Sequence, residues 1–190
     1  ATVSEISDET SSPVRGIVCD VARPTDISRM VEEVIGEFGR IDVLLNVAGV
    51  NRRKKVETVT EEDYDYILDI NLKGAFLVAQ AVGRQMIAQE SGSIINISSI
   101  AAVCSVGIVA YKTSKAGINA YTQSLAIGNA KYGIRANVIM PGLMETPMAI
   151  EGISKGLGVD KDELIRQRNA QVPLRGQMGT AWDIARAALF

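Results

Sequence analysis

The fold is decided by the sequence S-I-I-N-I-S at Ser93–Ser98, a helical pattern over Ala110–Tyr132, and I-R-A-N-V-I-M at Ile134–Met140. The two apolar runs have the length of strands, and the segment between them is long enough for a crossover helix. Gly133 ends the helical pattern just before the second run. A strand, a helix and a strand in this order predict two parallel strands joined by a helix.

The same alternation continues on both sides of this stretch. Thr25 is placed to cap the first helix and Gly39 to end it, and a break is expected near Asn71–Gly74. We expect further strands at Val14–Cys19 and Ile41–Asn46, and helices at Asp26–Phe38, Thr60–Gln89, Lys161–Asn169 and after Thr180. Near-continuous apolar strands between helices are typical of a parallel sheet covered on both faces, so the predicted fold class is α/β, doubly wound.

The composition excludes several functional classes. The chain has 190 residues, 47% of them hydrophobic, which suits one folded domain and excludes disorder. A net charge of -2 argues against a nucleic-acid partner. The sequence has no histidine, which removes Ser-His-Asp chemistry and His-ligated metal. Cys19 and Cys104 are isolated, so we expect neither zinc nor a disulfide, and a cytoplasmic location. No apolar run is long enough to cross a membrane.

Small or polar residues follow each expected strand. The strands lead into Asp20-Val21, Asn46-Val47-Ala48-Gly49, Ser98-Ser99 and Pro141-Gly142. In an open α/β sheet, ligands bind outside the carboxyl ends of the strands, where small residues let the backbone approach a ligand closely. Each corner alone is also typical of an ordinary turn, but the four together predict one crevice.

Tyr111 and Lys115 carry the sharpest chemical signal. They are four residues apart in Y-K-T-S-K, on one face of the expected helix. Lowering the pKa of a tyrosine from about 10 to about 7 requires about 4 kcal/mol. A lysine ammonium at about 4–5 Å supplies on the order of 3–4 kcal/mol at an effective dielectric near 20. The pair therefore predicts an acid/base centre that needs no histidine, with an exposed surface pair as the alternative.

Five motifs carry a family resemblance. They are N-V-A-G at Asn46–Gly49, N-L-K-G at Asn71–Gly74, I-S-S at Ile97–Ser99, Y-K-T-S-K at Tyr111–Lys115 and P-G-L-M-E-T at Pro141–Thr146. In this order they resemble the short-chain dehydrogenase/reductases, in the branch with an N-N-A-G-type motif. The resemblance covers essentially the whole chain. It implies a Rossmann-type fold, NAD or NADP as cofactor, and hydride transfer that interconverts a secondary alcohol and a ketone or aldehyde.

The resemblance also implies the roles of four catalytic residues. Tyr111 is expected to be the general acid/base, and Lys115 to lower its pKa while holding the nicotinamide ribose. Ser99 is expected to hydrogen-bond the substrate oxygen, and Asn71 to kink its helix and support a proton relay to Lys115. Ser98 has the spacing to Tyr111 that is more usual in the family, but Ser99 is the residue that matches the motif. The two serines should face opposite sides of the strand, and we expect Ser99 to be the catalytic one.

The cofactor contacts are implied in the same way. Asp20 and Val21 are expected to face the adenine. Pro141, Gly142 and Thr146 are expected to close over the nicotinamide. The residues that would line the adenosine side of the crevice are Asn46, Ala48 and Gly49, and those that would meet the ribose are Tyr111 and Lys115.

Part of the family pattern is missing. The resemblance implies two strands and a T-G-x-x-x-G-x-G turn before Val14, and a last strand beyond Phe190. We therefore expect 1–190 to be one incomplete NAD(P)-binding domain that binds the cofactor poorly on its own. The alternative to an enzyme is a non-catalytic protein that kept the fold for binding or regulation.

A glycine motif of the same form, G-x-x-x-G-x-G, occurs at Gly152–Gly158. It lacks the preceding strand that a phosphate-binding turn needs, so we expect a mobile loop with glycine hinges instead. It lies within 143–179, which we expect to form a lid on the substrate side. The apolar residues that could line a substrate pocket under this lid are Leu143, Met144, Met148 and Ile150.

Three weaker features remain. The basic run Arg52–Lys55 could steer an anionic substrate, although a solvated loop is the simpler interpretation. Cys104 has no base near it in sequence and is expected to be a bystander. The helices Thr60–Gln89 and Ala110–Tyr132 carry more apolar residues than one buried face needs. This surplus predicts a subunit interface. The resemblance implies a homo-oligomer, a dimer or tetramer built on these helices, and a small-molecule alcohol or carbonyl substrate.

Overall fold

Three parallel strands form the central sheet of the part of the chain that the structure describes. The structure is a computed structural model that describes residues 2–10, 12–104 and 107–190. The strands are β1 (Val43–Asn46), β2 (Gly92–Ile97) and β3 (Ile134–Ile139), in the spatial order β1-β2-β3. In register, Asn46 lies beside Asn96 and Ile97 beside Ile139. The prediction of a parallel α/β sheet is therefore confirmed.

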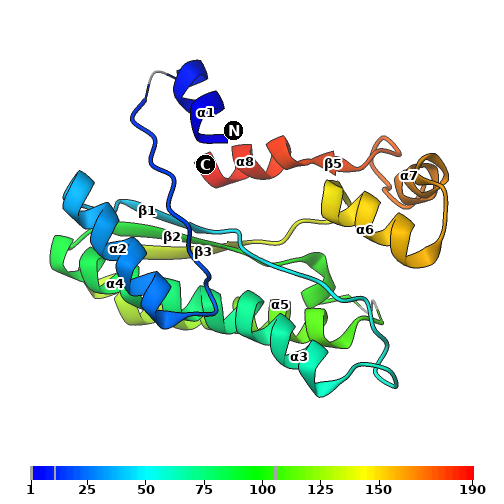
Figure 1. Ribbon diagram of the computed structural model, residues 1–190, viewed down its shortest axis with the longest axis horizontal. Coiled ribbons are helices and arrows are strands. Elements are labelled where there is room, and N and C mark those ends of the chain that lie inside the picture. Colours follow the sequence, from blue (N-terminus) through cyan, green and yellow to red (C-terminus); the bar gives the residue numbers. More distant parts are fainter. Residues whose placement is uncertain (1, 11, 105–106) are drawn as a thin grey trace.

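Helices cover one face of this sheet. In Figure 1, α2 (Pro24–Phe38), α4 (Ala75–Gln89) and α5 (Val109–Asn129) lie below the sheet, and α8 (Ala181–Leu189) lies above it. The core lies between α2, α4 and the sheet, and its buried members are Ile27, Val31, Val78, Ala79, Val82, Met86, Ile94 and Ile134. The opposite face is covered unevenly, because α8 packs against β3 while Val43 and Leu45 of β1 remain exposed.

The predicted break in the long helical region is a change of helix type. The helix α3 (Glu61–Leu68) leads into a π-helical segment, η1 (Asp69–Gly74), which continues as α4. Thr60 caps α3, since its side chain accepts a hydrogen bond from the backbone N–H of Asp63. A methyl group on Gly74 would lie 2.9 Å from Cγ2 of Val21, so glycine allows this close packing.

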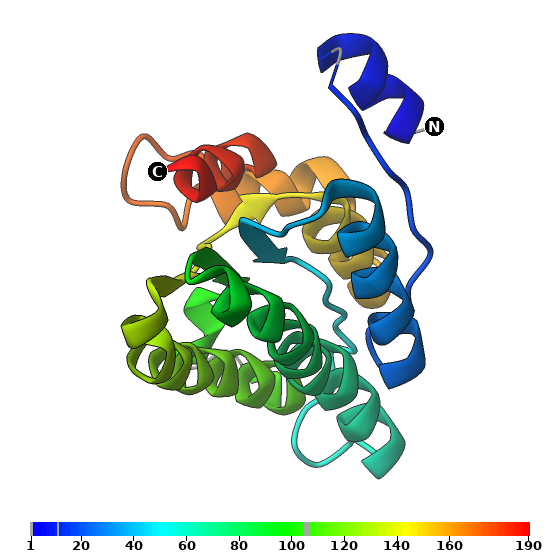
Figure 2. The ribbon, with the colours of Figure 1, turned by 90° about the vertical axis from the view of Figure 1, so that its left-hand side faces the viewer.

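The N-terminal part of the chain departs from the predictions. Val14–Cys19 is not assigned as a strand, because no described strand lies beside it to form a ladder of backbone hydrogen bonds. Figure 2 shows this segment crossing toward α1 (Thr2–Thr10), a helix that the sequence did not predict and that extends away from the rest of the chain. The prediction that Thr25 caps the next helix is also wrong, because α2 begins at Pro24 with Arg23 at the N-cap.

The predicted ends of the other helices are close to those observed. Gly39 ends α2 in the left-handed region, with φ at 76°. A 3-10 turn, η3 (Ala130–Tyr132), follows α5, and Gly133 closes it with φ at 68°. Gly133 also packs tightly, because a methyl group there would lie 2.8 Å from the carbonyl oxygen of Glu90.

The mobile loop predicted at Gly152–Gly158 is wrong. Pro147–Leu157 forms the helix α6, and Gly158 ends it. Thr146 caps this helix through its side chain and Pro147 occupies the first turn, two start signals that outweigh the glycines inside it. The helix α7 follows at Lys161–Asn169, as predicted.

Two short strands tie this C-terminal part together. The strand β4 (Met144–Glu145) pairs in parallel with β5 (Gly179–Thr180), and α8 follows directly. Thr180 and Asp183 form a capping box at the start of α8, in agreement with the predicted helix after Thr180. Of the helices that the structure describes, none combines the length and apolar character needed to cross a membrane.

Candidate active site

The carboxyl ends of the three strands meet at one edge of the sheet. The backbone N–H of Ser98 donates to the carbonyl of Ile139 at 2.8 Å, and that of Ile100 donates to the carbonyl of Pro141 at 2.9 Å. These bonds join the corners that follow β2 and β3. The predicted crevice therefore has a fixed backbone floor, from which side chains of α5 and the neighbouring loops extend.

Lys115 lies at the centre of this edge. It is buried on α5, and its Nζ donates a hydrogen bond of 2.7 Å to the carbonyl of Ile97. A methyl group on Gly49 would lie 3.7 Å from Nζ, so the bare backbone after β1 faces the amine. Burial lowers the pKa of Lys115 from 10.5 to about 8.

Tyr111 lies one turn before Lys115 on the same helix. Nζ of Lys115 is 5.7 Å from the centre of the Tyr111 ring. The pKa of Tyr111 is raised above its usual value, because burial of the phenol outweighs the opposing effects of the Ser99 hydroxyl and the Arg53 charge. The lowered pKa that we expected is thus not produced by this chain alone, since the amine of Lys115 is directed to a backbone carbonyl.

The two adjacent serines make different contacts. Ser98 is buried, and its hydroxyl donates to the backbone carbonyl of Lys115 at 2.8 Å. Ser99 is half-buried, accepts a hydrogen bond from the N–H of Ala101 at 3.1 Å, and lowers the pKa of Tyr111. Ser98 therefore attaches α5 to the end of β2, whereas Ser99 faces the phenol.

Asn71 joins three segments around the site. It is completely buried in η1, and its Oδ1 accepts a hydrogen bond of 2.7 Å from the N–H of Val50. Its Nδ2 donates to the carbonyl of Val50 at 3.0 Å and to the hydroxyl of Ser114 at 3.1 Å. The side chain therefore holds the loop after Gly49 against α5.

Two expected cofactor contacts already have partners within the chain. The side chain of Asn46 donates to Oδ1 of Asn96 at 2.8 Å and lies toward α4, so Ala48 and Gly49 are left to form the crevice wall. The carboxylate of Asp20 accepts from the N–H of Ala22 at 3.0 Å and pairs with Arg23. Val21 packs against η1 through Gly74.

The corner after β3 continues into the helix α6. Pro141 accepts the hydrogen bond from Ile100, and Gly142 is exposed, with open space where a side chain would lie. Thr146 caps α6 by accepting from the N–H of Ala149. These residues therefore connect the crevice to the predicted lid segment.

Sequence reasoning missed two polar residues near this crevice. Asn51 follows Val50, the residue that Asn71 holds, and lines a pocket with Arg53. Burial lowers the pKa of Arg168 on α7, and the charge of Arg53 lowers it further. No motif marks either residue in the sequence. The only sequence feature near these residues is the basic run Arg52–Lys55, which includes Arg53 but does not distinguish it from the other three cations.

Comparison with known proteins agrees with this geometry. A family profile described as Enoyl-(Acyl carrier protein) reductase matches residues 1–190. The chain is 37% identical, over its full length, to the 3-oxoacyl-[acyl-carrier-protein] reductase FabG of Chlamydia muridarum and covers 73% of that protein. The chain belongs to the short-chain dehydrogenase/reductase family. The chain is also 39% identical to the short-chain reductase protein NovJ of Streptomyces niveus, over 93% of the chain and 66% of that relative.

A solved member of the family has the same fold. The crystal structure of an NAD+-bound xylitol dehydrogenase matches with a TM-score of 0.92 and 32% identity, over 99% of this chain and 75% of that one. The chain therefore has an α/β Rossmann-like fold. The chain spans about two thirds to three quarters of the length of the relatives that it matches.

The burial of Lys115 leads to a prediction about stability. Between about pH 8 and pH 10.5 the folded chain binds fewer protons at Lys115 than the unfolded chain. The cost of burying its charge is therefore fully present below pH 8 and fades as the pH rises toward 10.5. We expect Lys115→Met to raise the free energy of unfolding at pH 7 by on the order of 2 kcal/mol. This is a net value, because the gain from removing the buried charge is reduced by the loss of the hydrogen bond to Ile97.

Urea denaturation at pH 7 and at pH 10 measures this effect. The gain should shrink at the higher pH, where the wild-type lysine is buried in its neutral form. Lys155→Met, at an exposed position on α6, is the control and should change stability little at either pH. A loss of stability at pH 7 in Lys115→Met would contradict the cost assigned to the buried charge.

Proposed function

We propose that this chain is the catalytic part of an NAD- or NADP-dependent oxidoreductase that interconverts a secondary alcohol and a ketone or aldehyde. The observation that supports this most strongly is the convergence of Ser99, Tyr111 and Lys115 at the carboxyl edge of a parallel sheet. Two of these residues lie one turn apart on α5 and the third follows β2. The hydroxyl of Ser99 and the phenol of Tyr111 can both meet a single substrate oxygen.

Each residue has a role that follows from its contacts. Tyr111 gives its proton to the substrate oxygen in reduction and takes it back in oxidation. Ser99 donates a hydrogen bond to the same oxygen and stabilises the charge that develops there. Lys115 supplies a positive charge beneath the phenol, and Asn71 keeps the loop after β1 in position beside it.

The crevice residues fit a nicotinamide dinucleotide. The exposed backbone at Gly49 next to Nζ of Lys115, and the open space at Gly142, leave room for a ligand along the strand ends. The nicotinamide supplies or accepts the hydride when it is bound. Lys115 and Tyr111 offer donors to ribose hydroxyls. The residues that would hold the two ends of the dinucleotide are Asp20, Val21, Ala48 and Gly49 on the adenosine side and Pro141, Gly142 and Thr146 on the nicotinamide side.

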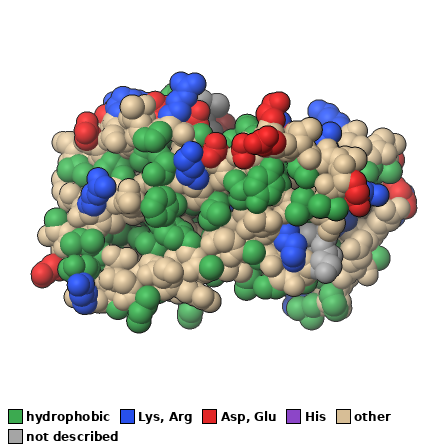
Figure 3. Space-filling view, turned by 90° about the horizontal axis from the view of Figure 1, so that it is seen from below, with side chains coloured by type: hydrophobic (Ala, Val, Ile, Leu, Met, Phe, Trp, Pro, Cys, Tyr) green, Lys and Arg blue, Asp and Glu red, His purple; other side chains and the backbone are tan. Residues whose placement is uncertain are grey.

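We also propose that the protein is a homo-oligomer built on α4 and α5. Most of the apolar residues that the sequence marked as surplus, including Ala75, Val78 and Ile118, are buried inside the chain. Phe76 and Ile127 remain exposed, by 40% and 82%. Figure 3 shows hydrophobic side chains on this helical face, among scattered charged ones.

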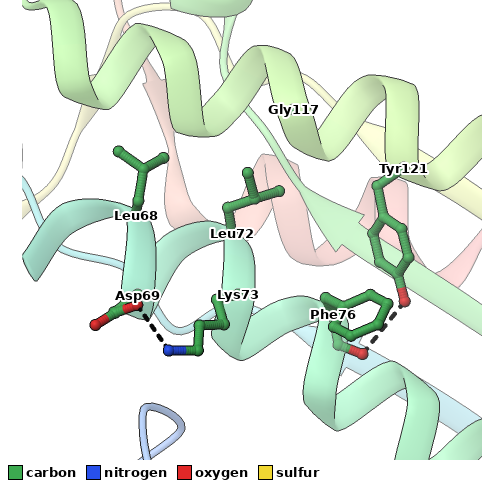
Figure 4. Close-up of a pocket in the computed structure, with 7 residues that line it drawn as sticks. All are labelled: Leu68, Asp69, Leu72, Lys73, Phe76, Gly117 and Tyr121. Atoms are coloured by element: carbon green, nitrogen blue, oxygen red, sulfur yellow. Dashed lines mark hydrogen bonds and ion pairs between the residues drawn. The ribbon is translucent and has the colours of Figure 1, made fainter. Parts of the chain in front are cut away.

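A pocket of about 470 Å³ lies on the same helical face, between η1, α4 and α5. Figure 4 shows Leu68 and Leu72 directed toward α5, with the Asp69–Lys73 ion pair on the outer side. The ring of Tyr121 packs edge-on against Phe76, and burial raises the pKa of Tyr121 to about 12. An apolar pocket beside exposed apolar side chains is suited to receive a second copy of the chain.

The role of Tyr111 is tested by Tyr111→Phe in the full-length protein. Loss of the phenol proton should lower turnover by about 10³-fold, while cofactor affinity stays nearly unchanged. Steady-state turnover and cofactor titration measure the two quantities. Retained turnover would contradict the proposed role, and intact cofactor binding without turnover of any alcohol or ketone in the wild type would favour a non-catalytic protein.

The adjacent serines form a matched pair for a second test. Ser99→Ala should lower kcat by about 10²-fold, because it removes a donor to the substrate oxygen. Ser98→Ala should lower stability by about 1 kcal/mol, because the carbonyl of Lys115 loses a hydrogen bond, with a much smaller effect on kcat. The kcat and thermal unfolding of both variants are measured together, and the reverse ranking of the two kcat values would assign the catalytic role to Ser98.

The proposed interface is tested by Phe76→Glu. A charge at this position should be costly to bury between two copies, so the variant should sediment as a smaller particle than the wild type. Leu174→Glu is the control, since Leu174 is 76% exposed and lies far along the chain, in the loop after α7. A wild-type protein that sediments as a monomer, or a Phe76→Glu variant of unchanged size, would contradict the interface.

A further inference from the structure

A second pocket lies between the loop after β1 and the helix α6. Its volume is about 300 Å³. Asn51 and Arg53 line it from the loop, and Gly152, Ile153, Gly156 and Leu157 line it from α6. One wall is therefore polar and cationic, and the other is apolar.

The two glycines keep the α6 wall open. Gly152 and Gly156 are four residues apart and lie on one face of the helix. A methyl group on either would meet no atom within 4 Å, so neither glycine is required by close packing. Glycine inside a helix costs about 1 kcal/mol relative to alanine, and here the pair leaves open space along the α6 wall.

Arg53 differs from its neighbour Arg52 in its pairing. Arg52 pairs with Asp63 at 2.7 Å and Glu62 at 3.7 Å, and its guanidinium lies 4.1 Å from the centre of the Tyr66 ring. Within residues 2–10, 12–104 and 107–190, no carboxylate lies within 4 Å of the Arg53 guanidinium. This side chain lines the pocket without a countercharge.

The surroundings of Arg53 connect the pocket to the candidate active site. Its charge opposes the rise that burial causes in the pKa of Tyr111, and it adds to the effect of burial in lowering the pKa of Arg168. Arg168 is half-buried, and its Nε donates to the sulfur of Met178 at 3.3 Å. Oδ1 of Asn51 is buried without a hydrogen-bond partner in the described part of the chain. Two like charges favour an anionic group, and the unpaired amide oxygen, which is a hydrogen-bond acceptor, favours a donor such as a hydroxyl on the same ligand.

We propose that this pocket binds an anionic group of the substrate, a carboxylate or phosphate, with Arg53 as its main contact. The inference rests on the proposed function and names its substrate class, an anionic hydroxy or oxo compound. A guanidinium donates paired hydrogen bonds to either group. The hydrocarbon part of such a substrate would lie against Ile153 and Leu157, with its reacting oxygen toward Tyr111.

The first experiment measures anion binding without turnover. The melting temperature of the full-length protein is measured in sodium phosphate and in sodium propionate, each compared with sodium chloride of equal ionic strength. A salt whose anion binds in the pocket should raise the melting temperature. Arg53→Gln should abolish the rise, whereas Lys55→Gln, an equal charge change at an exposed position in the same run, should keep it. Stabilisation by one salt alone identifies a phosphate or a carboxylate site, and stabilisation by neither overturns the proposal.

The second experiment fills the pocket. Gly152→Leu places a side chain in the open space and should abolish the stabilisation by the anion. Gly36→Leu is the control, because Gly36 also has open space around it but lies on α2. Loss of the anion effect in both variants, or in neither, overturns the assignment of the pocket.

The third experiment separates this inference from the proposed function. Turnover is compared for 3-hydroxybutyrate and its methyl ester, and for glycerol 3-phosphate and glycerol, with NAD and NADP. The anionic member of one pair should have a KM lower by about tenfold or more, and Arg53→Gln should remove this difference in KM. Equal KM values within both pairs overturn the inference alone. Anion binding that depends on Arg53, without turnover of any probe, supports the pocket and counts against the proposed function.

Discussion

The candidate site depends on the buried carboxamide of Asn71. Its oxygen and nitrogen hold both backbone groups of Val50, and its nitrogen also reaches Ser114. A polar group at full burial must find hydrogen-bond partners, and here they come from the loop after β1 and from α5. One side chain in the π-helical segment thus sets the separation between the bare backbone at Gly49 and the amine of Lys115.

A second chain of hydrogen bonds fixes the sheet against the same helix. Asn46 donates to Asn96 on the adjacent strand at 2.8 Å, and Asn96 donates to Thr122 on α5 at 2.9 Å. Thr122 in turn donates to the carbonyl of Ile118 at 2.7 Å. Asn46, which resemblance assigned to the cofactor crevice, therefore contributes by fixing the position of α5 along the strands.

Local signals in the sequence predicted most helix ends. Thr60, Gly39 and Gly133 act through their own capping or backbone conformation, so neighbouring sequence is enough to recognise them. The segment Val14–Cys19 has the apolar pattern of a strand, but a strand also needs a paired neighbour, which a local pattern does not reveal. The G-x-x-x-G-x-G spacing was equally ambiguous, because α6 forms through its cap at Thr146 and its packing.

The site was predictable to a similar degree. The motif spacing identified Tyr111 and Lys115 as neighbours, and the alternation of side chains along the strand separated Ser98 from Ser99. The direction of the Tyr111 pKa was not predictable, because it depends on burial and on where the lysine amine points. Asn51 was not predicted either, because it is of interest only as a residue that lines the second pocket, and the sequence does not reveal that pocket.

The π-helical segment also explains an unusual stripe of buried residues. Every fourth residue from α3 into α4 is buried: Asp63, Ile67, Asn71, Ala75 and Ala79. In a regular α-helix each step of four residues rotates the side chain by about 40°, so such a stripe would wind away from the core within a few turns. A π-helical turn contains more residues than an α-helical turn, so each step of four residues within 69–74 rotates the side chain in the opposite direction. This opposite rotation offsets the drift of the stripe. The helix can therefore keep one straight edge against the rest of the protein, with Asn71 at its midpoint.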